Sequence, residues 1–319
     1  DIQWINNALG RKIPLNIDGR LNKPFQDVFS DATQEQRGRK IKERAVQPSA
    51  ISQRQKPDKL VASWDELFER LDIQDGATIS FHHHLRNGDK IVNEVVARLA
   101  SRGIMGLTLA PSALFSVHDA LLPYIKDGVI AKIEGSMNGA IGAACSHGEI
   151  AQTCILRSHG GRQRAIREGD LPIDVAFIAA PCADLFGNAN GLYGSSACGP
   201  LSYAKPDSEY AKKVVILTDN LVPYPCSSWS IRGGNVDYVL NVESIGDSSR
   251  IVSGTTQLTK SPTQLVIARL AARFIEAAGL MKDGFSFQAG AGGISLAATV
   301  FLAERMRNAG IKASFAHGG

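Results

Sequence analysis

Apolar residues recur along the chain with two different periods. Short apolar runs predict buried strands, and stripes with apolar positions three or four residues apart predict helices. Strands are predicted at 77–82, 107–110, 129–135, 152–159, 173–180, 214–218, 236–242, 285–290 and 313–315. Helices are predicted at 63–71, 89–99, 116–126, 139–147, 161–169, 264–280 and 293–308. Strands that alternate with helices are typical of an α/β fold with a largely parallel sheet flanked by helices.

Two helices carry recognisable signals at their ends. Ser63 and Glu66 form a capping box at the start of the first helix. The helix at 264–280 has Pro262 near its start and Gly279 near its end, where these residue types are favoured.

Residues 1–58 are polar and contain several prolines, which predicts an extended arm with little regular structure. Residues 1–60 hold twelve Lys and Arg against seven Asp and Glu, a balance of +5 in a chain whose net charge is +4. A basic arm can bind nucleic acid or an acidic partner, or lie solvated on the body of the protein. Because few aromatic residues lie among the charges, we favour the solvated arm and expect no nucleic acid.

Composition places the chain among ordinary globular proteins, with 44% apolar and 21% charged residues. No stretch approaches the ~18 consecutive apolar residues of a membrane span, and residues 1–12 lack the apolar core of a signal peptide. The five cysteines are scattered without a CxxC pair. We therefore expect no membrane association and a cytoplasmic location.

In parallel sheets, ligands bind in the loops that follow the carboxyl ends of strands. This rule selects the loops at 82–89, 135–142, 158–162 and 288–293. The loops come from strands that are far apart in the sequence, so the fold must bring them together for one site to form.

The first loop contains three consecutive histidines in FHHHLRNGD, residues 81–89. Adjacent residues on a strand point to opposite faces, so these histidines cannot jointly chelate one ion, and no metal site is predicted. They are either hydrogen-bonded structural residues or part of an anion site. In an anion site, Arg86 would bind the anion, Asn87 and Gly88 would form the turn, and amides at the next helix start would face the ligand. Asp89 is a natural N-cap of that helix.

Further loops contain glycine or asparagine at positions suited to turns. RSHGGR, residues 157–162, is either a tight turn or a set of amides that face an anion or oxyanion. APCADLFGNANG, residues 180–191, is either held by Asx turns or positions a ligand, and Cys182 within it is expected to be inert. QAGAGGIS, residues 288–295, lacks the spacing of a dinucleotide fingerprint and is interpreted as a backbone cradle for a carboxylate or thioester.

Several long motifs together resemble one family. They are DGATISFHHHLRNGD, RSHGGRQRAIREGDLPIDVAFIAAP, FGNANG, DNLVPYP and FSFQAGAGGISLAATVFLAERMR, and they closely resemble citrate lyase alpha subunits over roughly residues 60–319. The resemblance implies a CoA-transferase-like fold of two similar domains, each with a largely parallel sheet. In this chain the arm would span 1–58, the first domain 59–258, and the start of an incomplete second domain 259–319.

The resemblance implies an acyl exchange. Citrate and an acetyl thioester on an acyl carrier subunit would give a citryl thioester and acetate, through a mixed anhydride without a covalent enzyme intermediate. The chain itself would hold no cofactor, and would act on the phosphoribosyl-dephospho-CoA-type prosthetic group of the carrier or on acetyl-CoA. The implied partners are the beta subunit (citryl lyase) and the gamma subunit (acyl carrier protein), within an oligomer.

In the light of this resemblance, we assign roles to residues of the selected loops. Arg86 and Arg162 would bind carboxylates of the citrate trianion. His83 would donate a hydrogen bond to citrate or act as acid/base, and His84 is less favoured. The predicted catalytic residues are His83, Arg86, Asn87 and Gly88. The predicted substrate-binding residues are His159, Gly160, Gly161, Arg162, Asn188 and Asn190, with Gln288, Gly290, Gly292 and Gly293 on the opposite wall.

Rival functions remain open at this point. One is a free-standing CoA-transferase that uses an enzyme glutamate as nucleophile. Another is a non-catalytic scaffold subunit whose basic arm docks a partner. Sugar-phosphate isomerisation is a fold-level analogy without a matching motif.

Overall fold

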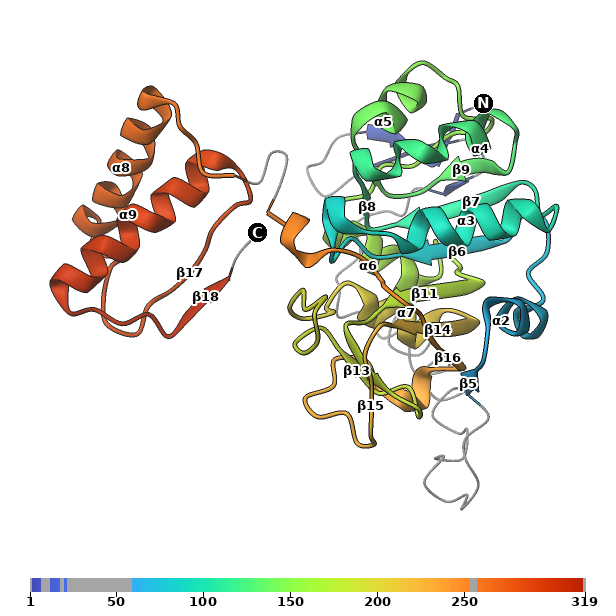
Figure 1. Ribbon diagram of the computed structural model, residues 1–319. Coiled ribbons are helices and arrows are strands. Elements are labelled where there is room, and N and C mark those ends of the chain that lie inside the picture. Colours follow the sequence, from blue (N-terminus) through green and yellow to red (C-terminus); the bar gives the residue numbers. More distant parts are fainter. Residues whose placement is uncertain (1, 7–11, 18–19, 22–58, 253–256, 318–319) are drawn as a thin grey trace. The chain divides into compact units, whose positions relative to one another are not determined.

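The computed structural model describes residues 2–6, 12–17, 20–21, 59–252 and 257–317 (Figure 1). The chain divides into two compact units, Asp1–Ser248 and Ser249–Gly319, and each is described by itself. This division lies ten residues before the predicted boundary between 258 and 259. Among the described residues, none of the helices is long and apolar enough to cross a membrane.

The first unit is built on a seven-stranded sheet with the strand order β5-β16-β14-β11-β6-β7-β9. Every neighbouring pair in this sheet is parallel, as the alternation of strands and helices predicts. The strands are β5 (Leu60–Val61), β6 (Thr78–Phe81), β7 (Leu107–Pro111), β9 (Ile130–Ile133), β11 (Val175–Ala179), β14 (Lys213–Thr218) and β16 (Tyr238–Asn241).

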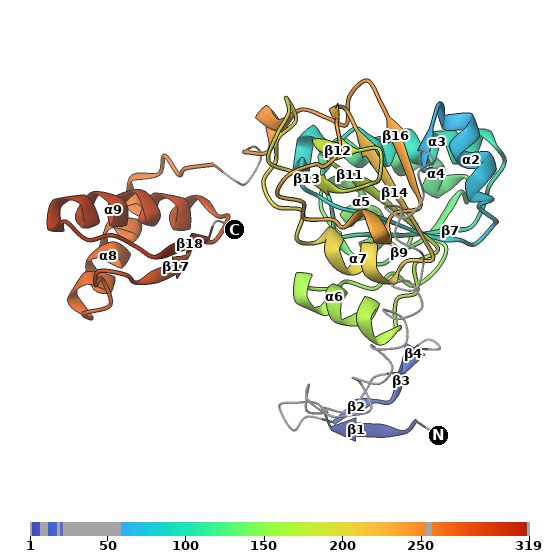
Figure 2. The same cartoon turned by 90° about the horizontal axis from the view of Figure 1, so that it is seen from below.

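Helices cover both faces of this sheet (Figure 2). On one face, Phe68 of α2 packs against Phe177 of β11, and α3 lies beside α2. On the other face, apolar residues of α6 and α7 share a core with Ile178 and Ile216. The helices are α2 (Trp64–Leu71), α3 (Ile91–Ser101), α4 (Leu122–Lys126), α5 (Gly139–Ser146), α6 (His159–Glu168) and α7 (Ala204–Tyr210).

Short elements connect the main strands and helices. A parallel pair is formed by β8 (Ala113–Leu114) and β10 (Ser136–Met137). A small mixed sheet consists of β12 (Cys182–Asp184), β13 (Ala189–Asn190) and β15 (Leu221–Val222). The 3-10 turns are η2 (Arg86–Gly88), η3 (Ser116–Leu121), η4 (Gly233–Asn235) and η5 (Ser248–Arg250).

Residues near Ser63 determine where the first helix, α2, begins. The Ser63 hydroxyl accepts the Glu66 amide at 3.2 Å, and the Glu66 carboxylate accepts the Ala62 amide at 2.7 Å. The predicted capping interaction is therefore present, with Glu66 reaching one residue further back than a capping box requires. A first-turn amide and the amide just before the helix thus find side-chain partners, which helps α2 to begin in an exposed loop.

The strand predicted at 152–159 is wrong. Only Ile155 forms a bridge there, with Glu134. The apolar part of the segment is short, and Leu156 is 71% exposed. The segment therefore has no buried apolar face that would stabilise it as a strand. The predicted helix at 116–126 is split into η3 and α4, because Pro123 in the first turn of α4 cannot continue the preceding turn's hydrogen bonds.

The N-terminal segment contains more regular structure than predicted. β1 (Trp4–Asn6) pairs with β2 (Lys12–Pro14), and β3 (Asn16–Ile17) pairs with β4 (Arg20–Leu21), both antiparallel. Ile5 lies opposite Ile13, and β-branched pairs of this kind favour strands. The rest of the predicted arm, residues 22–58, lies outside the described residues.

The second unit is a small α/β unit. β17 (Ser286–Gln288) and β18 (Phe315–His317) form a parallel pair, and α8 (Pro262–Ala277) packs against α9 (Gly293–Ala309). Its buried core contains Ala272, Met281 and Leu302. Gly279 adopts φ 69° just after α8, as the predicted helix end requires.

Candidate active site

Loops from distant parts of the sequence meet at the carboxyl edge of the main sheet, as the strand-end rule predicts. Four aromatic rings gather there, from His83 after β6, Phe115 after β8, His159 at the start of α6, and Tyr203 before α7. The His83 centroid lies 5.0 Å from that of His159, 5.1 Å from Tyr203 and 6.0 Å from Phe115. His159 and Tyr203 are 4.7 Å apart. We call these four residues the ring cluster.

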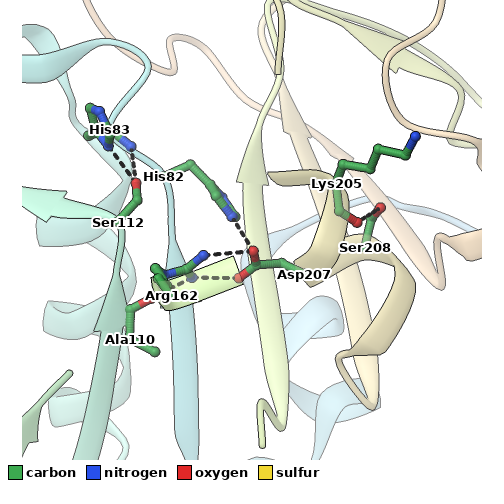
Figure 3. Close-up of polar contacts among 8 residues, drawn as sticks. All are labelled: His82, His83, Ala110, Ser112, Arg162, Lys205, Asp207 and Ser208. Atoms are coloured by element: carbon green, nitrogen blue, oxygen red, sulfur yellow. Dashed lines mark hydrogen bonds and ion pairs between the residues drawn. The ribbon is translucent and has the colours of Figure 1, made fainter. Parts of the chain in front are cut away.

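His83 is the histidine held most firmly in the ring cluster. Its backbone N–H donates to the Ser112 hydroxyl at 3.0 Å, and its Nδ1 lies 2.6 Å from the same oxygen (Figure 3). Burial, followed by the charges of His159 and Arg86, lowers the pKa of His83 to about 3. The imidazole is therefore neutral near pH 7. If the Ser112 proton is donated to Nδ1, the Nε2–H remains to donate to a ligand.

His159 brings the start of a helix to the same place. It is the first residue of α6, and the Ser158 hydroxyl accepts the Gly161 amide at 3.1 Å as the N-cap. The amides of His159 and Gly160 occupy the first turn, where no partner exists within the helix. The helix dipole favours an anion at this point. Burial, and then the charge of Arg162, lowers the pKa of His159.

Arg162 does not have the predicted role as a citrate anchor. Its side chain is only 2% exposed, and it forms two hydrogen bonds with the Asp207 carboxylate, at 2.6 and 2.9 Å. Its Nη2 also donates to the Ala110 carbonyl at 2.8 Å, at the end of β7. The guanidinium is thus buried and already hydrogen-bonded to protein groups, so it is not accessible to a small anion.

Asp207 and His82 complete this buried network. The His82 Nε2 lies 3.1 Å from Asp207 Oδ2, and Figure 3 shows the His82 side chain directed toward the carboxylate. Burial alone would raise the pKa of Asp207, but Arg162 and His82 outweigh it and hold the pKa well below its usual value. Asp207 is therefore ionised and balances the Arg162 charge.

His84, the less favoured histidine, is half-buried. Its ring stacks on that of His82 with centroids 5.5 Å apart. Burial lowers the pKa of His84 well below its ordinary value, so this ring is neutral as well. Among the described residues, no group of His, Cys, Asp or Glu is arranged to hold a metal ion.

In the turn at 86–89, Arg86 lies at the ring cluster, and Gly88 has a different role from the one predicted. Arg86 adopts φ 51° and places its guanidinium 4.8 Å from the Phe115 ring centroid, at the edge of the ring cluster. Burial lowers the pKa of Arg86. The Gly88 amide donates to the Leu85 carbonyl at 2.8 Å, so this predicted catalytic residue does not offer its amide to an oxyanion.

Gly88 and Asp89 have structural roles instead. A Cβ on Gly88 would lie 1.9 Å from the Asp247 carbonyl oxygen, so the close approach of the two segments requires glycine. Asp89 Oδ2 accepts the Val92 amide at 3.0 Å, so Asp89 caps the first turn of α3 from the position before the N-cap, which is Lys90. The position of Asn87 between Arg86 and Gly88 places it in the same turn, as predicted.

Gly160 and Gly161 open a helix, as predicted, and their contact with substrate stays a prediction. Both residues lie in the first turn of α6, but the Gly161 amide is already used by Ser158. Gly160 has open space where a Cβ would lie. Within the described residues, the amides left for a ligand in this turn are therefore those of His159 and Gly160.

Asn188 and Asn190 hold a loop together and do not face a ligand. The Asn188 side chain donates to Asp184 at 2.9 Å and accepts the Gly233 amide at 2.9 Å. Asn190 is fully buried; it donates to the Ser227 carbonyl at 2.7 Å. Their predicted role in substrate binding is replaced by the alternative interpretation, in which Asx turns hold the loop.

Gln288, Gly290, Gly292 and Gly293 lie in the second unit. They form the turn from β17 to α9, and Gly292 is the N-cap of α9. A Cβ on Gly293 would lie 2.8 Å from the Gln257 carbonyl oxygen. The strand-to-helix turn is as predicted, and its place opposite the loops of the first unit stays a prediction.

Sequence reasoning missed several residues of the site. Ser112 follows β7 directly, so the strand-end rule applied to this strand would have selected it. Tyr203 and Asp207 belong to the polar segment YAKPDSEY, whose pattern of apolar residues does not predict a helix. Glu134, at the end of β9, was also missed; it is 1% exposed and paired with Lys132 at 3.3 Å and Arg157 at 3.0 Å.

The parallel sheet, with loops from distant segments gathered at its carboxyl edge, defines an α/β protein, as predicted. Comparison with known proteins narrows this class. The chain belongs to the family "Citrate lyase, alpha subunit (CitF)", whose model matches residues 57–319.

Individual relatives agree with this assignment. The chain is 48% identical over 262 residues to the citrate lyase alpha chain of Klebsiella pneumoniae, covering 82% of this chain and 52% of the relative. It is 44% identical over 282 residues to that of Haemophilus influenzae, covering 88% and 56%. The chain therefore spans about half the length of the curated relatives that it matches.

A solved structure shares the fold. It is described as the alpha subunit of citrate lyase from Streptococcus mutans in complex with citrate. The TM-score is 0.77 at 47% identity, and the match covers 86% of this chain and 53% of the other.

Proposed function

We propose that the protein acts as the acyl-exchange transferase of citrate lyase. A citrate carboxylate oxygen attacks the acetyl carbonyl carbon of a carrier-bound thioester, and the thiolate leaves. The thiolate then attacks the citryl carbonyl of the resulting mixed anhydride, and acetate leaves. The observation that carries this proposal is the family match over residues 57–319, which includes all four residues of the ring cluster.

The geometry of the ring cluster supports this chemistry. Each attack develops negative charge on a carbonyl oxygen, and preorganised donors stabilise such a charge by about 3 kcal/mol apiece. The available donors are the Nε2–H of the neutral His83 and the first-turn amides of α6. A neutral histidine suits this task because it stays uncharged while it donates its hydrogen bond.

Citrate is a trianion, so its remaining carboxylates need positive potential. Arg86 supplies a cation at the edge of the ring cluster, held against Phe115. The dipole of α6 adds to the same potential. Arg162 forms a neutral pair with Asp207, so it adds little positive potential and does not contact the substrate. We therefore retain Arg86 as the citrate anchor and remove Arg162 from that role.

The remaining expectations form part of this proposal. The thioester would be carried by a phosphoribosyl-dephospho-CoA-type group on the gamma subunit, or by CoA in acetyl-CoA. The beta subunit would cleave the citryl product, the assembly would be oligomeric, and the complex would be cytoplasmic. The printed names of the relatives support the citrate lyase complex and citrate, and the finer assignments are our own.

The route through an enzyme glutamate is less well supported in the first unit. Glu134 is the buried glutamate nearest to a strand end, but Lys132 and Arg157 hold both of its carboxylate oxygens. A carboxylate paired with two cations is a weak nucleophile. Borohydride treatment of acyl-CoA-loaded enzyme would reveal a glutamyl thioester as a reduced residue, and we expect none.

The direct test is to incubate the protein with acetylated carrier and citrate and to follow the carrier's mass. We expect the acetyl carrier to become the citryl carrier. His83→Ala is expected to slow this exchange by about 100-fold, since one oxyanion donor is lost. Arg86→Ala is expected to weaken citrate binding, whereas replacing the exposed Arg164 by Ala serves as the matched control. Equal activity of His83→Ala and the parent protein would refute the proposed site.

A further inference from the structure

A fully buried carboxylate lies beneath the ring cluster. Asp207 is 0% exposed, and its two oxygens accept hydrogen bonds from Arg162 at 2.6 and 2.9 Å. The same carboxylate faces His82 Nε2 at 3.1 Å. Buried ion pairs of this kind add little to stability compared with apolar residues of the same size. Stability alone therefore does not explain why this buried ion pair is present.

The sequence positions of His82, Arg162 and Asp207 suggest a role in placing the rings above them. His82 directly precedes His83. Arg162 lies three residues after His159, which is about one turn of α6. Asp207 lies four residues after Tyr203, again about one turn. Each of the three rings, those of His83, His159 and Tyr203, thus lies one residue or one helical turn from one of the three buried residues.

Three separate segments meet at this carboxylate. The end of β6 contributes His82, the first turn of α6 contributes Arg162, and α7 contributes Asp207 itself (Figure 3). Arg162 also reaches the Ala110 carbonyl at 2.8 Å and so connects the end of β7. Besides the ring contacts themselves, Asp207 is the point at which these three segments meet through polar side-chain contacts.

We propose that Asp207 is the positioning residue of the candidate active site. It sets the mutual placement of His83, His159 and Tyr203 through the segments that carry them, and it touches no substrate. It also balances the charge of Arg162, which lies close enough to His83 and His159 to oppose their protonation. Its effect on turnover rests on the proposed function, but its effect on the ring geometry does not.

Asp207→Asn tests this assignment because it keeps the side-chain shape and removes the charge. In the variant, Arg162 keeps its charge without a carboxylate, so protonation of His159 becomes harder and its pKa falls. The three rings also lose their common anchor. Stacked rings shift each other's proton resonances, so a change in their placement moves the signals of both histidines.

The experiment uses the whole chain with labelled histidine side chains, followed by NMR from pH 5 to pH 8 without substrate. His83→Gln and His159→Gln assign the two signals. We expect Asp207→Asn to move both signals and to lower the pKa of His159. Asp184→Asn is the matched control, because Asp184 is also fully buried and accepts several hydrogen bonds, but at the end of β12. It is expected to leave both signals in place.

A folded Asp207→Asn protein with unchanged His83 and His159 signals would overturn the assignment. If this variant does not fold, His82→Asn is measured instead, because it leaves the Arg162 pair intact. The His83 signal is then expected to move, and an unmoved signal would equally overturn the assignment.

Turnover provides the second readout. If the proposed function holds, Asp207→Asn is expected to lower kcat by about 10-fold to 100-fold with a smaller change in KM, as misplaced groups do. If the parent protein shows no acyl exchange but the NMR changes occur, the proposed function fails and the positioning role stands.

Discussion

The neutral state of His83 makes the stability of the first unit depend on pH. In the folded protein its pKa is lowered to about 3, whereas an unfolded histidine has a pKa of about 6.5. Between these values the unfolded chain binds a proton that the folded chain does not. Protonation therefore favours unfolding, and the stability is fully present above about pH 6.5 and is lost progressively as the pH falls toward 3.

The magnitude follows from the difference between the two pKa values. A single such group costs about 1.4 kcal/mol for each pH unit below the unfolded pKa. Between pH 6.5 and pH 5 the loss from His83 is thus about 2 kcal/mol. Burial also lowers the pKa values of His84 and His159, so these residues add to the loss in the same direction.

The assay compares the parent protein with His83→Asn in urea at several pH values. All three tryptophans, Trp4, Trp64 and Trp229, lie in the first unit, so their fluorescence reports on the unfolding of that unit. The parent protein should lose about 2 kcal/mol more than the variant between pH 6.5 and pH 5. His147→Asn, at a side chain that is 71% exposed, should leave the slope unchanged. Parallel profiles for the parent protein and His83→Asn would refute a neutral, buried His83.

Other variants test the packing around the site through their urea midpoints. Gly88→Ala forces a Cβ against the Asp247 carbonyl and should destabilise the first unit by about 3 kcal/mol or more, or displace the turn; an unchanged midpoint would contradict the close approach. Arg162→Met leaves Asp207 buried and unpaired and should cost about 3–5 kcal/mol, and adding Asp207→Leu should restore part of that loss; a neutral Arg162→Met would mean that the pair is solvated. Asn190→Ala removes the three hydrogen bonds of this side chain, with Cys226, Ser227 and Leu192, and should cost about 1–3 kcal/mol without changing citrate binding; weaker citrate binding would show that Asn190 contributes to the substrate site.

The main sheet was predictable because its strands are continuous apolar runs. All five residues of β11 are buried, and the segment IDVAFIAA shows this in the sequence. The strand predicted at 152–159 is wrong because three apolar residues in a polar context resemble a strand even when only one of them, Ile155, pairs with a neighbour. Only the tertiary structure shows that Leu156 faces outward.

The loops of the candidate site were predictable, but the contacts inside them were not. The strand-end rule selected the loops that hold His83 and His159. It could not show that Arg162 points inward, because its partner Asp207 is 45 residues away in a polar helix. The same limit applies to Asn188 and Asn190, whose residue types suit a ligand loop and an Asx-turn loop equally well.

The mixed anhydride route is tested most directly with citrate that carries heavy oxygen in its carboxylates. In a single turnover with acetylated carrier, the attacking citrate oxygen remains on the acetyl group when acetate leaves. The account therefore predicts acetate with one heavy oxygen in the first turnover. Unlabelled acetate in that turnover, or no acetate release at all, would contradict it, and a label found on an enzyme glutamate would identify the covalent route instead.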